Sequence, residues 1–66
     1  MDHYNHVQYC VYTQDANFKS VLEWIESREL LYEVHLNRTR FWVPKNTPVY
    51  TEFMLRWFHC TSSVVE

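Results

Sequence analysis

Glycine is absent from this 66-residue chain, which removes the one residue type that adopts a positive φ without steric cost. Any turn that needs a left-handed backbone must therefore use Asn, Asp or a strained residue. The absence also excludes a Gly-rich loop, the usual means of holding a phosphate group or an oxyanion with backbone N–H groups. The common nucleotide-binding motifs are thus missing.

Other features are scarce. No apolar run approaches the roughly 20 residues of a membrane span, and the N-terminus lacks the basic and apolar regions of a secretory signal. The net charge is −2, from 6 Lys and Arg against 8 Asp and Glu, so the basic excess typical of nucleic-acid-binding or membrane-surface proteins is missing. Because Cys10 and Cys60 are the two cysteines and lie far apart, we expect reduced thiols in a cytoplasmic protein.

Aromatic residues are abundant, at 18% of the chain. The length predicts one domain over residues 1–66, with a loose N-terminus at 1–5 and a tail or short edge strand at 61–66. A domain this small buries a limited share of its surface, so its stability is marginal. Buried aromatic rings add much apolar area to such a core.

The hydrophobic pattern begins with residues 6–13, where β-branched and aromatic residues alternate and predict a strand. The period then changes to that of a helix, with Asp15 as a candidate cap and an end near residues 28–29. The residues of this helix that we expect to face the core are Phe18, Val21, Leu22 and Ile25.

Residues 30–43 predict a β-hairpin. We place its turn at Asn37-Arg38, because Asn tolerates the left-handed backbone of a two-residue hairpin loop. This register gives one continuous apolar face, by pairing Leu36 with Thr39, Val34 with Phe41 and Tyr32 with Val43. On the opposite face it pairs His35 with Arg40 and Glu33 with Trp42.

Thr47-Pro48 predicts the start of a second helix, since a hydroxyl cap precedes Pro at the first helical position. We expect this helix to end at about His59 or Cys60. The resulting order, β-α-β-β-α with a possible last strand, predicts a two-layer α+β sandwich with the first strand beside the third and both helices on one face. It resembles the ferredoxin-like, split βαβ arrangement, a topology that does not itself indicate a function.

Metal binding and catalysis find little support in the pattern. His3, His6 and Cys10 are potential ligands, but His6 and Cys10 on one strand would lie about 13 Å apart at the usual rise per residue. Neither Cys10 nor Cys60 lies at a helix N-terminus that would activate a thiol. We therefore expect no cofactor, no metal and no catalytic residue.

Two surfaces are the better candidates for function. The second helix is apolar almost all round, more than so small a domain can bury, although a crowded aromatic core would also explain the pattern. The residues that we expect to form a partner or homodimer interface are Met54, Leu55, Trp57 and Phe58. The outer face of the sheet is the alternative, displaying Tyr12, Glu33, His35, Arg38, Arg40 and Trp42.

These surfaces give two hypotheses. The first is a small non-catalytic protein-interaction module, dimeric and acting as an inhibitor or modulator of a partner protein. Phage-encoded proteins that act in the host cytoplasm are often of this kind. The second is binding of single-stranded nucleic acid on the open sheet, by stacking of bases on aromatic side chains beside Arg, whereas cross-strand pairs on a half-solvated face would need no ligand at all.

Overall fold

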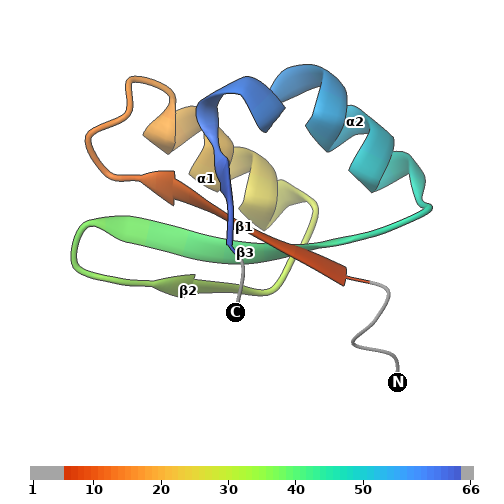
Figure 1. Ribbon diagram of the computed structural model, residues 1–66, viewed down its shortest axis with the longest axis horizontal. Helices are drawn as coiled ribbons and strands as arrows, with labels where there is room; N and C mark the ends of the chain where they lie inside the picture. The colour runs from red at the N-terminus through yellow and green to blue at the C-terminus, as the bar shows by residue number, and fades with distance from the viewer. Residues whose placement is uncertain (1–5, 65–66) are drawn as a thin grey trace.

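The computed structural model describes residues 6–64, which form a four-stranded antiparallel sheet with two helices on one of its faces (Figure 1). The expected two-layer α+β architecture is confirmed. The loose N-terminus expected at 1–5 lies outside the described residues, as do residues 65 and 66. The elements are β1 (His6–Tyr12), α1 (Phe18–Ser27), β2 (Tyr32–Val34), β3 (Arg38–Pro44), α2 (Pro48–Arg56), the 3-10 helix η2 (Phe58–Cys60) and β4 (Ser62–Ser63).

The strand order is β2-β3-β1-β4, so β1 lies beside β3 as expected. These two central strands pair along their whole length, from His6 opposite Pro44 to Tyr12 opposite Arg38. The tail supplies a short edge strand, since Ser62 and Ser63 pair with β1. The sheet therefore consists of two long inner strands and two short edges.

Alternate residues of β1 and β3 face the helices and form the core with them. The core consists of Tyr9, Val11, Val21, Trp24, Ile25, Phe41, Val43 and Phe53. Phe53 lies at its centre, with its ring 4.5 Å from that of Tyr9 and 5.7 Å from that of Phe41, measured between centroids. Aromatic packing thus fixes α2 against the sheet.

Helix α1 differs from its prediction at its start and in the residues that it buries. It begins at Phe18, and its N-cap is Asn17 without a side-chain cap. Asp15 instead accepts a hydrogen bond from the Asn17 backbone N–H (2.8 Å) in the preceding turn. Trp24 was not expected in the core but is buried, because it faces Phe53 of α2 (6.1 Å between ring centroids).

The predicted hairpin register is wrong by two residues. The turn is at Leu36-Asn37, closed by the His35 N–H donating to the Arg38 carbonyl (2.8 Å). The observed pairs are Tyr32 with Phe41, Glu33 with Arg40 and Val34 with Thr39. A shift of two residues keeps each side chain on its face, since side chains alternate with a period of two.

The turn also needs no left-handed residue. Within residues 6–64, positive φ occurs at Glu29 and Asn46, and Asn37 is not among them. The Asn37 carbonyl instead accepts a hydrogen bond from the Thr13 N–H (2.9 Å), which ties the loop to the end of β1. A contact between distant segments therefore decides the turn, and local propensity does not.

The predicted start of α2 is confirmed. Thr47 has an extended backbone, and its hydroxyl accepts a hydrogen bond from the Tyr50 N–H (3.3 Å) and donates one to the Pro44 carbonyl (2.8 Å). The predicted end is wrong, because α2 ends at Arg56 and a separate 3-10 turn follows. This break redirects the chain so that Ser62 and Ser63 reach the edge of β1.

Candidate interaction surfaces

The end of α2 and the following 3-10 turn carry exposed apolar side chains, which we call the α2–η2 patch: Met54, Leu55 and Phe58. Leu55 is 81% exposed and Phe58 47%, while Met54 is exposed to a lesser degree. Burial of Phe53 sets this orientation, since the two residues that follow it on the helix must point away from the core. Phe58 follows in the 3-10 turn.

Phe58 is held rigidly although it is half exposed. Its ring makes edge-to-face contacts with Tyr9 (6.3 Å between centroids) and Phe53 (6.4 Å). Trp57, the fourth residue that the sequence suggested for this interface, is only partly exposed. The Arg56 guanidinium lies 5.4 Å from its ring centroid, a cation–π geometry. Trp57 is therefore a supporting residue at the margin of the patch.

Charged groups near the patch are paired. The Glu52 carboxylate accepts hydrogen bonds from Arg28 Nε (3.0 Å) and Nη2 (2.8 Å), and a longer one from Arg56 Nη1 (3.3 Å). The hydrogen bond from Arg28 is the main reason that the pKa of Glu52 lies below its ordinary value. The bidentate pair joins the end of α1 to α2, so the surface beside the patch is polar and carries two positive charges against one negative charge.

The outer face of the sheet brings together all six residues that the sequence suggested for it, in rows across the strands. The predicted opposition of His35 with Arg40 and of Glu33 with Trp42 is wrong. The observed rows are Leu31, Trp42, Gln8 and Val64; then Glu33, Arg40, Cys10 and Ser62; then His35, Arg38 and Tyr12.

Arg40 is the centre of a polar chain on this face. Its guanidinium lies 3.7 Å from the Glu33 carboxylate, which also lies 3.3 Å from His35 Nε2. With the Gln8 amide oriented to satisfy its hydrogen bonds, the amide oxygen accepts from Arg40 Nε (2.9 Å) and Nη2 (3.2 Å). Cys10, between Arg40 and Ser62, is only 1% exposed. The face is thus partly satisfied by its own contacts.

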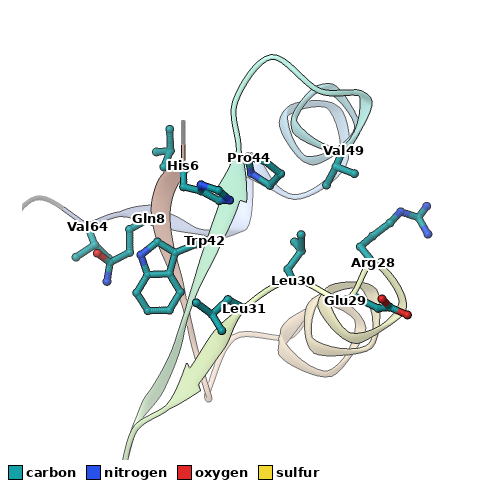
Figure 2. Close-up of a pocket in the computed structure, with 11 residues that line it drawn as sticks. His6, Gln8, Arg28, Glu29, Leu30, Leu31, Trp42, Pro44, Val49 and Val64 are labelled. Carbon is teal, nitrogen blue, oxygen red and sulfur yellow. The ribbon is translucent and has the colours of Figure 1, made fainter. Parts of the chain in front are cut away.

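An open hollow lies beside the segment that precedes β2 and the end of β3 (Figure 2). Trp42 and Gln8 bound it on the outer face of the sheet, and Leu30 and Val49 bound it toward the helices. The contributions of Leu31 and Val64 were not predicted, because the position of Leu31 depends on the hairpin register and that of Val64 on the pairing of β4. The lining is mixed, with apolar side chains beside the polar His6, Gln8, Arg28 and Glu29.

The cysteines and the potential metal ligands can be located among residues 6–64. Cys10 and Cys60 are both unpaired thiols. Burial is the main cause of the raised pKa of Cys60, which disfavours the nucleophilic thiolate. Among residues 6–64, no three side chains of His, Cys, Asp or Glu converge to hold a metal ion; His3 lies outside this range.

Comparisons with protein-family models, curated proteins and solved structures gave no match to this chain. Of the helices that the structure describes, none combines the length and the apolar character needed to cross a bilayer. The function must therefore be inferred from the geometry of its surfaces.

Proposed function

We propose that this protein is a non-catalytic interaction module whose α2–η2 patch docks on a partner protein. The observation that carries the proposal is the exposure of Leu55 and of the Phe58 ring, three residues apart in the chain. Apolar anchors of this kind dominate the energetics of protein interfaces when a partner removes them from water.

The rigidity of the patch supports this role. Because Tyr9 and Phe53 hold the Phe58 ring in edge-to-face contacts, little side-chain entropy is lost when a partner covers it. Met54 is unbranched and polarisable, and it adapts to the shape of an opposing surface. Exposed Arg56 and His59 supply a polar margin of the type that surrounds apolar interface centres.

Further details belong to the same proposal. The strand order β2-β3-β1-β4 with antiparallel pairing is consistent with the ferredoxin-like arrangement that we propose for the fold. We propose that the protein acts as an inhibitor or modulator in the cytoplasm, where unpaired thiols such as those of Cys10 and Cys60 persist. A phage-encoded modulator acting in its host remains the model suggested by analogy.

A matched pair of variants tests the patch. Leu55→Ser removes its most exposed side chain, while Leu31→Ser changes a side chain of similar exposure (71%) at the sheet edge. Both variants should keep the wild-type circular dichroism spectrum and melting temperature. In affinity capture from the native cell, we expect Leu31→Ser to retain the protein partner and Leu55→Ser to lose most of it. Equal retention by both variants would contradict the proposal.

Binding of single-stranded nucleic acid on the outer sheet face is the second candidate. The observation that favours it is the placement of Trp42 and Arg38 on an uncovered face, with Tyr12 opposite Arg38. Against it, Arg40 is already engaged by Glu33 and Gln8. Oligonucleotides at low salt should quench tryptophan fluorescence in the wild type but not in Trp42→Phe, and absence of quenching would exclude this function.

A further inference from the structure

The outer edge of β2 has unpaired backbone groups. The Trp42 N–H donates to the Leu31 carbonyl (3.1 Å), and the His35 N–H donates to the Arg38 carbonyl (2.8 Å). Residues 31, 33 and 35 therefore direct their backbone groups toward β3, because orientation alternates along a strand. Tyr32 and Val34 direct theirs away from β3, toward an edge on which no strand of residues 6–64 lies.

This edge is short, at three residues, and its length is its main protection against pairing with another chain. β2 contains no Lys, Pro or bulge, three other features that natural proteins place on exposed edges. Val34 is 69% exposed, and Leu36 beyond it is fully exposed. Glu33 is the charged residue of β2, and its carboxylate lies 3.7 Å from the Arg40 guanidinium.

We propose that β2 pairs antiparallel with β2 of a second copy of this chain, about a two-fold axis at Val34. Tyr32 and Val34 have outward backbone groups, so Val34 opposes Val34 of the partner subunit as a hydrogen-bonded pair. The pairing ends before Tyr32, because Leu36 of the partner subunit, the residue that would lie opposite it, belongs to the hairpin turn. Glu33 lies opposite His35 of the partner subunit on the outer face, which is a favourable cross-strand pair.

The competing registers are less favourable. An axis at Glu33 would place two carboxylates directly opposite one another, which destabilises a strand pair. An axis at Tyr32 would oppose Val34 with Leu30 of the partner subunit. The Leu30 N–H is already bonded to the Ile25 carbonyl (3.1 Å) at the end of α1. Charge and hydrogen bonding thus both select the axis at Val34.

The proposed dimer joins two four-stranded sheets into one continuous sheet. It uses a different surface from the α2–η2 patch, since Phe58 packs against Tyr9 of β1, and β3 separates β1 from β2. Each subunit therefore keeps its patch available for a partner protein. Failure of the dimer and failure of the patch are separately measurable.

Sedimentation equilibrium of three variants tests the edge. Val34→Lys puts two like charges on the axis and should raise the dimer dissociation constant by about tenfold or more. Val34→Thr keeps a β-branched residue and should leave the dimer nearly intact. Leu55→Lys changes the α2–η2 patch and should also leave it intact. A monomeric wild type at the highest soluble concentration, or a dimer lost only in Leu55→Lys, would overturn the proposal.

Amide hydrogen exchange of the wild-type protein tests the register without any substitution. The N–H group of Val34 should become protected as the protein concentration rises through the dimer dissociation constant. The N–H of Glu33 should change little, because it is already directed to β3. Concentration-independent exchange at Val34 would exclude pairing at this edge even if the protein dimerises elsewhere.

Discussion

The two faces of the sheet are built from the same strands but are stabilised by different interactions. On β3, Thr39, Phe41 and Val43 are fully buried beneath the helices, whereas the intervening Arg38, Arg40 and Trp42 are partly exposed. The covered face is dominated by apolar and aromatic packing around Phe53. The uncovered face is dominated by a polar chain centred on Arg40.

We expect this difference to assign folding stability to the covered face and binding to the uncovered face. Loss of a side chain on the covered face leaves a cavity in a close-packed core, while an exposed ion pair contributes little to folding. We therefore expect substitutions on the covered face to change the free energy of unfolding strongly. Substitutions on the uncovered face should alter binding more than folding.

Phe53→Ala should have the largest effect. The side chain is fully buried and its ring lies near those of Tyr9, Trp24 and Phe41, so its removal should lower the free energy of unfolding by about 3–5 kcal/mol. Urea denaturation measures the change. If the alanine variant does not fold, Phe53→Leu should fold with a smaller loss, and a loss no greater than that of Trp42→Ala would remove the contrast between the faces.

The second largest effect should be a loss of folding stability at high pH, through Tyr9 on the covered face. Burial, with a smaller contribution from Tyr50, raises the pKa of Tyr9 to about 12. In the unfolded chain this phenol ionises near its ordinary pKa of about 10, so stability is complete below pH 10. It is lost as pH rises toward 12, by up to about 1.4 kcal/mol per pH unit.

Tyr9→Phe should remove this part of the alkaline destabilisation. Thermal unfolding between pH 9 and 12 would show it as a flatter dependence than in the wild type. Tyr32→Phe is a useful comparison, because the pKa of Tyr32 is raised by its hydrogen bond to Glu26 at the surface. A Tyr9→Phe profile identical to that of the wild type would contradict the assignment.

Thr39→Val should stabilise the protein by about 1 kcal/mol. Thr39 is fully buried, and its hydroxyl finds no hydrogen-bond partner among the described residues. An unsatisfied buried polar group costs free energy that an apolar isostere avoids. Thermal and urea unfolding measure the gain, and Val43→Thr, which adds a hydroxyl to the same face, should have the opposite sign.

Arg40→Met should have the smallest effect on folding, at most about 1 kcal/mol. Methionine retains an apolar chain beside Cys10 but loses the contacts with Glu33 and Gln8. A loss comparable to that of Phe53→Leu would show that the polar chain stabilises the fold as much as the core does. The expected small loss of folding stability would show that residues of the outer face can change with little effect on the fold.

The strands and helices were largely predictable because their signals are local. Alternation over residues 6–13 and the Thr47-Pro48 start each depend on neighbouring residues, and β1 and α2 begin accordingly. Leu55, which an excess of apolar residues on the second helix suggested as an interface residue, is exposed, and its role stays a prediction. The burial of Trp24 was missed, since it depends on Phe53 of the other helix.

The sequence by itself determined which residues share a face, since the periods of strands and helices follow from backbone geometry. Only the tertiary structure decided the hairpin register, through the bond from Thr13 to Asn37, and thereby placed Glu33 beside Arg40. It also ended α2 at Arg56 so that the chain could reach β1. Contacts between distant segments carry no local signal, and here they define both the free edge of β2 and the polar chain on the outer face.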